Sequence, residues 1–400
     1  MATLWNSKLE GTAYGRPPQH PNHLLTQVGP GTPCGELMRR FWQPVLASRN
    51  VTSRPREVRI LGEDLLVFRD GSGRPGLVYP RCMHRGTSLL YGHVEPDGIR
   101  CCYHGWKFSV EGECIDQPCE PDGGLNKAAA RQPWYPVRER YDMVWAYMGP
   151  PEKMPVLPRW DVLEEIRDDE DYGVFDNSFG THRDPNGPEI APYSWLHMND
   201  NIMDPFHVQV LHSTFSEIQF VKEFEVMPTV DFEYIDNGVI YKAYRKLDDG
   251  REVDRISTWM MPNIMSVPST QLAPGKSTGL AFVVPVDDSH CRIVGCTRLK
   301  KGTTRQAYRV NGKSWTEMTL EERQDVPNDY EAQAGQGPIS LHSEEHLATS
   351  DRGIAMQRRT LEQQIRLVQD GGDPLGVILD PAKEMVKVPS GNFFRQPEMA

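Results

Sequence analysis

Two short segments of the chain each pair one cysteine with one histidine. Cys82 and His84 are separated by one residue, Cys101 and His104 by two, and sixteen residues lie between the pairs. Two thiolates and two neutral imidazoles can hold a 2Fe–2S cluster in which the cysteines bind one iron and the histidines the other. The same residue types could hold structural zinc, but zinc sites usually pair cysteine with cysteine and histidine with histidine. The spacing therefore favours the mixed-ligand cluster.

A second group of metal-ligand types lies between residues 201 and 212. His207 and His212 are five residues apart, which is about 140° around a regular helix. They can converge only if the helix ends or bulges between them. Two imidazoles and one carboxylate on one face of an iron leave positions open, as O₂ activation at non-haem iron requires. Asp204 lies on the face of His207, where it can orient a ligand from outside the metal's own shell.

The elements around the first group are short strands. Residues 58–61 and 65–68 are short apolar runs, the first interrupted by Arg59, and turn signals follow at residues 70–73 and 97–98. These patterns predict a small all-β unit over residues 46–150. A helix over residues 33–43 precedes it, with Thr32 as N-cap and Pro33 as its first residue.

The rest of the chain mixes types. Pro150-Pro151 opens a Pro-rich, acidic stretch, through Asp171, that has the composition of a linker. Beyond it, residues 201–211 are helix-like, residues 223–300 contain several strand candidates, and residues 351–367 form a charged amphipathic helix. Strands and helices are segregated, which predicts an α+β fold with an antiparallel sheet covered by helices.

We therefore expect a lead-in with a helix (1–45), a β domain (46–150) and an α+β domain (151–400). The composition is that of a globular protein, with 38% hydrophobic and 25% charged residues among 400. The net charge of −11 disfavours a nucleic-acid partner or an anionic membrane. No apolar run approaches the roughly 20 residues of a membrane span, and residues 1–6 lack the pattern of a secretory signal. The expected location is the cytoplasm.

Eight cysteines are too few for a disulfide framework in a chain of this length. Cys114 and Cys119, just after the second cysteine-histidine pair, are expected to be structural or free thiols. The isolated cysteines, Cys34, Cys291 and Cys296, are expected to be small buried hydrophobic residues.

The two segments Cys82-Met83-His84-Arg85-Gly86 and Cys101-Cys102-Tyr103-His104-Gly105-Trp106 resemble the cluster loops of Rieske domains in ring-hydroxylating oxygenases. By this resemblance Cys101 is the ligand, and Cys102 occupies a position where the family often has proline. Respiratory Rieske proteins join the loops by a disulfide, but the matching positions here are Thr87 and Tyr103. The resemblance thus implies the lower-potential, oxygenase-type cluster.

The segment from Asn201 to His212 resembles the iron motif of the same family, in which an aspartate precedes two histidines. This implies that His207 and His212 bind a mononuclear Fe(II). It also implies that Asp204 bridges to a cluster histidine of the neighbouring subunit.

The family takes its third iron ligand from a late helix. The segment 346–359 resembles that helix in the phthalate dioxygenase branch, with Asp351 at the ligand position. Glu344 and Glu345 are the rivals, although they lie in a polar run typical of a solvated face. In the strand-like segment 241–245, Arg245 could hold a substrate carboxylate, as an arginine does in the phthalate enzymes; the alternative is an ordinary surface arginine.

The resemblance implies the terminal oxygenase, or α-type subunit, of a Rieske non-haem iron system. Such an enzyme uses O₂ and electrons from NAD(P)H to hydroxylate or dihydroxylate an aromatic substrate, here expected to be a phthalate-like or phenoxybenzoate-like carboxylate. The chain has no nicotinamide or flavin fingerprint, so a separate reductase is implied, usually with FMN and a plant-type 2Fe–2S cluster. Homotrimers or stacked trimers are expected. The alternatives are an O- or N-demethylase of the same family and a Rieske electron carrier without mononuclear iron.

Overall fold

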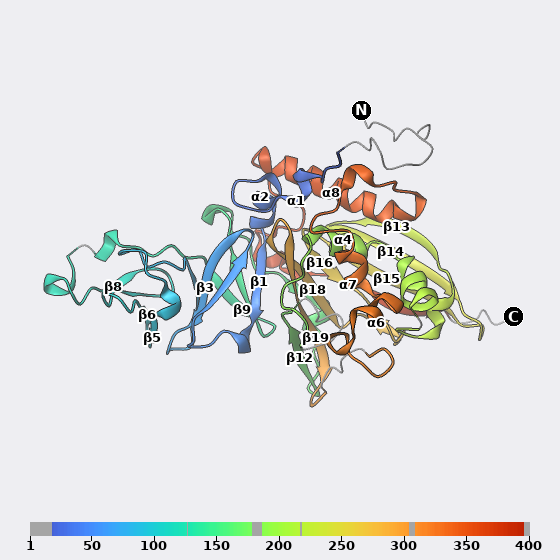
Figure 1. The fold of residues 1–400 in the computed structure, drawn as a ribbon, viewed down its shortest axis with the longest axis horizontal. Helices are drawn as coiled ribbons and strands as arrows, with labels where there is room; N and C mark the ends of the chain where they lie inside the picture. The colour runs from blue at the N-terminus through green and yellow to red at the C-terminus, as the bar shows by residue number, and fades with distance from the viewer. Residues whose placement is uncertain (1–17, 126, 178–185, 217, 304–308, 396–400) are drawn as a thin grey trace.

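The computed structural model describes residues 18–125, 127–177, 186–216, 218–303 and 309–395. The chain forms an elongated molecule with a narrow β part at one end and a larger α+β part at the other (Figure 1). This arrangement confirms the expected fold, an N-terminal all-β region followed by an α+β region with an antiparallel sheet.

Two short helices open the described chain, α1 (His23–Thr26) and α2 (Pro33–Arg39). Thr32 caps α2 as predicted, because its Oγ1 accepts a hydrogen bond of 3.2 Å from the amide of Gly35. The helix ends at Arg39, earlier than predicted. Trp42 then begins the first strand, β1, whose side chains are all buried.

In the described residues, the β part has ten strands in three antiparallel sheets. One sheet has the order β1-β10-β9, another β2-β3-β4, and the third β5-β6-β7-β8. The strands are β1 (Trp42–Ala47), β2 (Arg56–Ile60), β3 (Glu63–Arg69), β4 (Pro75–Val78), β5 (His93–Glu95), β6 (Gly98–Arg100), β7 (Lys107–Phe108), β8 (Cys114–Asp116), β9 (Val137–Arg140) and β10 (Met143–Tyr147). The four-stranded sheet lies at the outer tip (Figure 1).

The outer tip has a small hydrophobic core of its own. Its buried members are Leu66, Phe68, Val78, Cys82, Leu89, Ile99, Cys101, Phe108, Val110 and Cys114. A second, much larger core runs from α2, β1 and β10 into the sheet of the α+β part. The β part thus shares a core with the α+β part at one end and has a separate core at the other.

The stretch after Pro150 is packed, which corrects its interpretation as a linker. It contains β11 (Arg159–Trp160) and α3 (Asp161–Glu164), and β11 pairs in parallel with β20 (Met385–Val386). Trp160 is 2% exposed, and its ring centroid lies 5.6 Å from that of Trp145 and 5.5 Å from that of Phe282. Its burial joins the two parts of the chain in one core.

A nine-stranded antiparallel sheet forms the α+β part. Its main path runs β12-β19-β18-β16-β15-β14-β13, and β21 pairs with both β15 and β17. The strands are β12 (Glu170–Phe175), β13 (Thr229–Ile235), β14 (Gly238–Lys246), β15 (Glu252–Met260), β16 (Ile264–Ser266), β17 (Gly275–Lys276), β18 (Gly279–Asp287), β19 (His290–Lys300) and β21 (Gly391–Arg395).

Helices cover this sheet, and the longest, α8, packs against α1, α2, β13 and β14 (Figure 1). The helical elements used below are α4 (Trp195–Ile202), α5 (His207–Gln209), a π-helical segment η7 (Val210–Phe215), α6 (Leu320–Asp325), α7 (Asp329–Ala334) and α8 (Arg352–Gln369). Short 3₁₀ turns include η8 (Lys222–Glu225), η10 (His342–Glu344) and η11 (Thr349–Asp351). Within the described ranges, every helix is too short or too polar to cross a bilayer.

Candidate functional site

Two similar loops at the tip of the β part carry the cysteine-histidine pairs. The amide of Gly86 donates to the carbonyl of Cys82 at 2.8 Å, and that of Gly105 to the carbonyl of Cys101 at 3.1 Å. Both glycines have φ near +75°, at +77° and +73°, a region that other residues rarely adopt. The same tight turn therefore presents each pair.

The four side chains of these pairs face one another across the loops. Cys82 and Cys101 are 2% and 3% exposed, and burial raises the pKa of the Cys82 thiol to about 11. The rings of His84 and His104 are half-buried, with centroids 4.6 Å apart. Two buried thiols behind two outer imidazoles fit a cluster with one cysteine-bound and one histidine-bound iron.

Trp106 supports the His84 ring. The two rings are stacked, with centroids 4.3 Å apart and an angle of 7° between their planes. Cys114 and Cys119 are both free thiols, and Cys114 is buried in the small core of the tip. The thiol of Cys119 lies 3.5 Å from the carbonyl of His104. These contacts agree with the expectation that Cys114 and Cys119 are structural or free thiols.

The second histidine pair lies on a helix that changes its winding. Helix α5 carries His207 and ends at Gln209, and the chain continues as the π-helical segment η7, which carries His212. A π-helix bonds residue i to i+5, so residues five apart come onto nearly the same face. The two ring centroids are 5.4 Å apart. This is the bulge that the spacing of the two histidines requires.

Asp329 is the carboxylate that meets this pair. Its Oδ1 lies 3.5 Å from Nε2 of His207 and 3.2 Å from Nε2 of His212. Asp329 is the first residue of α7, held there by a capping box of Asn328 and Glu331. Among the described residues, these three form the one group whose ligand atoms could share a metal ion. Two imidazoles and one carboxylate match the facial set of non-haem iron sites.

Asp351, the carboxylate expected from the sequence, lies elsewhere. It ends the turn η11 directly before α8, and its Oδ2 accepts the amide of Ala348 at 2.7 Å. The rival Glu345 pairs with Arg358, and Glu344 lies in the turn η10. The predicted position of the third carboxylate is therefore wrong.

Two amide side chains hold the histidine-aspartate group in place. Gln219 Oε1 lies 2.7 Å from Nδ1 of His212, and Asn201 Nδ2 donates to Oδ1 of Asp329 at 3.1 Å. A bond to the second ring nitrogen fixes the tautomer and the direction of a metal-binding imidazole. Sequence reasoning assigned no role to either amide, because neither follows a spacing rule.

Asp204 lies directly behind His207. Its Oδ1 accepts the amides of Phe206 and His207, at 2.9 and 3.3 Å, and its Oδ2 lies 3.5 Å from Nδ1 of His207. Burial alone would raise the pKa of this carboxyl, but the interactions with His207 hold it below its usual value. The pKa of His207 is raised, because Asp204 and Asp329 outweigh its burial. The Asp204 side chain is 31% exposed, so it is also accessible from outside the chain.

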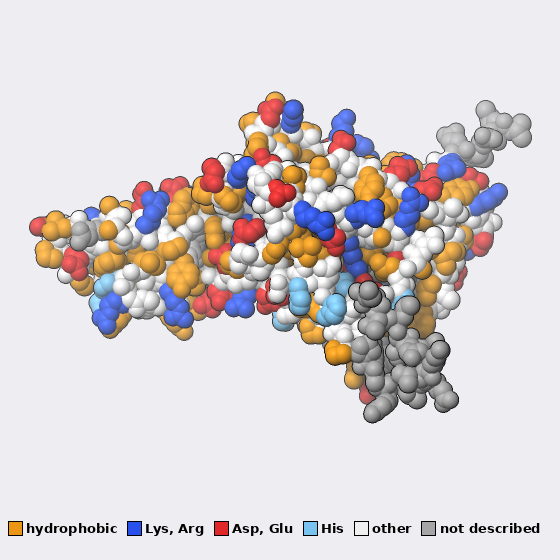
Figure 2. Space-filling view, turned by 90° about the horizontal axis from the view of Figure 1, so that it is seen from above, with side chains coloured by type: hydrophobic (Ala, Val, Ile, Leu, Met, Phe, Trp, Pro, Cys, Tyr) orange, Lys and Arg blue, Asp and Glu red, His pale blue; other side chains and the backbone are white. Residues whose placement is uncertain are grey.

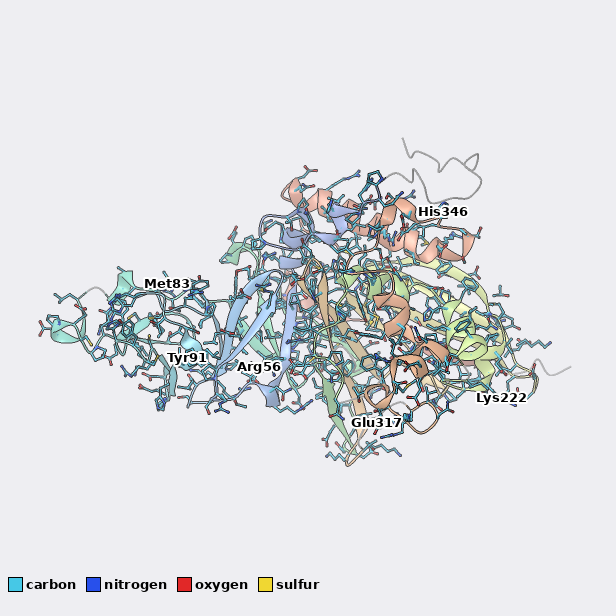
Figure 3. The ribbon with its side chains drawn as sticks, in the orientation of Figure 1. Arg56, Met83, Tyr91, Lys222, Glu317 and His346 are labelled. Atoms are coloured by element: carbon cyan, nitrogen blue, oxygen red, sulfur yellow. The ribbon has the colours of Figure 1, made fainter. Side chains whose placement is uncertain are left out.

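The two sites lie far apart in one chain. Met83 lies between Cys82 and His84, and Figure 3 shows it in the narrow β part at one end of the molecule. Lys222 lies in the turn that follows the histidine pair, and the same figure shows it at the opposite end. The view has the longest axis of the molecule horizontal, so this separation is real.

A partly buried ion-pair network ties α4 to α8 beside the histidine-aspartate group. Arg358 donates to Asp200 at 2.6 Å and to Glu345 at 2.9 Å, and its side chain is 13% exposed. Burial raises the pKa of Asp200 to about 6 in spite of this partner. Asp200 precedes Asn201, so the network fixes the end of α4 from which Asn201 reaches Asp329.

We expect Arg358→Met to lower the free energy of unfolding by roughly 3 kcal/mol, because it leaves two largely buried carboxylates without their partner. Asp200→Asn combined with Arg358→Met should recover part of that loss. Denaturant unfolding of both variants measures the effect, with the exposed neighbour Arg359→Met as the matched control. Equal losses for Arg358→Met and Arg359→Met would show that the network does not stabilise the fold.

Arg245 lies on β14 at the far side of an aromatic row that begins at His212. The ring centroid of Phe220 is 4.5 Å from that of His212 and 6.1 Å from that of Phe224. The guanidinium of Arg245 lies 5.0 Å from the Phe224 ring. Arg245 is 2% exposed and its Nε donates to the carbonyl of Val226, yet its buried Nη1 has no partner among the described residues.

Burial, together with the nearby guanidinium of Arg255, lowers the pKa of Arg245 to about 10. A buried arginine without a carboxylate partner lowers the stability of the fold, because its charge has been removed from water without compensation. The expectation that Arg245 could be an ordinary surface arginine is wrong.

The chain is similar to known proteins in both sequence and fold. Residues 41–136 match the Rieske [2Fe-2S] domain. The chain is 56% identical over 385 residues to the phenoxybenzoate dioxygenase subunit alpha of Ectopseudomonas oleovorans, covering 96% of this chain and 94% of the relative. It is 31% identical over 290 residues to the phthalate 4,5-dioxygenase oxygenase subunit of Pseudomonas putida, 67% of this chain and 61% of that one. Dicamba monooxygenase has the same fold, with a TM-score of 0.56 at 17% identity over 83% of this chain and 98% of that one.

The chain therefore belongs to the Rieske non-haem iron oxygenases. It is a terminal oxygenase of the aromatic ring-hydroxylating kind, in the branch that includes phthalate dioxygenase. Its cofactors are a Rieske 2Fe–2S cluster and a mononuclear iron.

Proposed function

We propose that Cys82, His84, Cys101 and His104 hold the Rieske cluster, and that His207, His212 and Asp329 hold the mononuclear iron. The convergence of two Nε2 atoms on one carboxylate oxygen supports the second assignment. The iron supplies the activation of O₂ when bound. The chain's own residues orient its ligands: Gln219 holds His212, and Asn201 holds Asp329.

We propose an aromatic carboxylate as the substrate. The unpartnered Nη1 of the buried Arg245 supports this choice, since a guanidinium fork matches a carboxylate. The aromatic row of Phe220 and Phe224 between Arg245 and His212 would pack on the ring and exclude water from the reacting carbon. The named relatives include enzymes of phenoxybenzoate and phthalate.

The reaction needs two electrons per O₂, and a separate NAD(P)H-dependent reductase would deliver them. We propose the reductase type with FMN and a plant-type cluster, and a location in the cytoplasm, where NAD(P)H is supplied. We also propose a homotrimer, or stacked trimers, in which Asp204 links the cluster of one subunit to the iron of the next. The wide separation of the two sites within one chain supports that last step.

Substrate-dependent O₂ uptake tests this function. The holoenzyme with a surrogate reductase should consume O₂ with aromatic carboxylates such as 3-phenoxybenzoate or phthalate and yield hydroxylated rings. Formaldehyde release from methoxy or N-methyl substrates would favour the demethylase instead. Iron at about two rather than about three per chain, with no uptake, would identify an electron carrier and overturn the proposal.

Arg245→Met should raise KM for a carboxylate substrate by roughly 10- to 150-fold, the worth of one to two charged hydrogen bonds. Turnover of the matching neutral methyl ester should change little. Steady-state O₂ uptake with the acid and its ester measures the difference, and Arg245→Lys should restore part of the affinity. A similar loss for acid and ester would show that Arg245 only supports the fold through Val226 and Phe224.

A further inference from the structure

A cavity of about 390 Å³ opens between α8 and the edge strand β13. Its lining residues are Phe232, Tyr234, Arg352, Ala355, Met356 and Arg359. None of them belongs to the histidine-aspartate group or to the aromatic row that leads to Arg245. The volume is that of a site for a compound of one or two rings.

The floor of the cavity is apolar and fixed. Side chains alternate along a strand, so Phe232 and Tyr234 face α8 while Asp231 and Glu233 face away. A Cβ placed on Gly353 would lie 2.4 Å from the ring of Phe232, so the helix backbone packs directly on that ring. The Phe232 ring of this floor is therefore in place before any ligand binds.

The rim of the cavity is cationic. Arg352, Ala355, Met356 and Arg359 follow the i, i+3, i+4, i+7 pattern and so share one face of α8. Both arginines are exposed, and neither forms an ion pair within the described part of the chain. No carboxylate lines the cavity. This is unusual for a chain with a net charge of −11. Figure 2 shows basic side chains gathered on the face that carries α8.

We propose that this cavity is a second, non-catalytic binding site for an aromatic carboxylate. The ring would lie on Phe232, Tyr234 and Met356, and the carboxylate would reach Arg352 or Arg359. Two guanidinium groups that start about 10.5 Å apart along the helix can meet a carboxylate at either end of a two-ring compound. The site takes the same chemical class as the proposed substrate, but its argument rests on its own residues.

Anaerobic equilibrium dialysis of the holoenzyme with 3-phenoxybenzoate tests the proposal. We expect two molecules bound per chain. Arg352→Gln combined with Arg359→Gln should weaken one of them at least tenfold, with kcat and KM unchanged. Arg366→Gln is the matched control, because Arg366 is exposed seven residues further along the same stripe but does not line the cavity.

The outcomes separate this site from the catalytic one. Arg245→Met should remove the other bound molecule. If Arg245→Met kept both molecules, the proposed contact of Arg245 with the substrate would be wrong, but the cavity site would stand. Two molecules retained by the double variant would overturn the cavity site. So would an equal loss in Arg366→Gln, displacement by equimolar inorganic phosphate, or equally tight binding of 3-phenoxybenzyl alcohol, which lacks the carboxylate.

Discussion

Asp329→Ala is expected to abolish oxygenation while leaving the Rieske cluster intact. The substitution removes the carboxylate whose Oδ1 lies within 3.5 Å of both histidine Nε2 atoms. Turnover should fall at least about 1,000-fold, equivalent to about 4 kcal/mol in the barrier. Iron should fall from about three to about two per chain, because the cluster loops lie in the other part of the molecule. Iron quantitation, cluster absorbance and O₂ uptake check the three effects.

Asp351→Ala is the matched control for this experiment. Among the described residues, the Asp351 side chain accepts only the amide of Ala348 at the start of α8, so its loss should leave iron and turnover near the wild-type values. If Asp351→Ala lost iron and Asp329→Ala kept it, the third iron ligand would be Asp351, as expected from the sequence.

Asp204→Asn should keep its cluster, its iron and its oligomeric state but lose nearly all turnover. The amide keeps the size of the carboxylate and removes the charge that holds Nδ1 of His207. In a single turnover with substrate and O₂, the reduced cluster should be reoxidised roughly 100-fold more slowly than in the wild type. Stopped-flow absorbance of the cluster gives this rate.

Asp287 offers a control with the same geometry. It pairs with His290 three residues on, at 2.9 Å, and neither residue belongs to the two sites. Asp287→Asn should leave cluster reoxidation unchanged. If the cluster of Asp204→Asn were also reoxidised at the wild-type rate, Asp204 would not bridge the two sites. Its role would be that of a helix cap, which is worth about 1 kcal/mol of stability.

The geometry of each cysteine-histidine pair and of the histidine pair could be predicted, because the two members of each pair are close in the sequence. Two residues separate Cys101 from His104 and four separate His207 from His212, so spacing alone limits the geometry. The third carboxylate is not local. Asp329 carries only the signals of a helix start, and several acidic residues surround it between residues 317 and 331. The position of Asp329 beside His212 depends on where α7 packs. The resemblance of residues 346–359 to the family's late helix did not indicate that packing.

The same limit explains the misinterpreted linker. The proline and acidic residues after residue 150 have the composition of an exposed segment, yet Trp160 is buried against Trp145 and Phe282. A single aromatic residue decided the packing, and its partners come from strands far apart in the sequence. Arg245 was identified on its strand, but its burial follows from Phe224 and Val226, which pack over it.

The shared core that runs from β1 and β10 into the large sheet has a mechanical consequence. A cluster carried on a tethered head can swing towards its acceptor, and its rate then reflects diffusion of that head. Here the β part shares its larger core with the α+β part. In the proposed trimer, the distance from the cluster of one subunit to the iron of the next would therefore be set by the length of the β part and by the packing of the subunits. In the proposed trimer, electron delivery would therefore depend on how the subunits pack, without a large hinge rotation of the β part in each catalytic cycle.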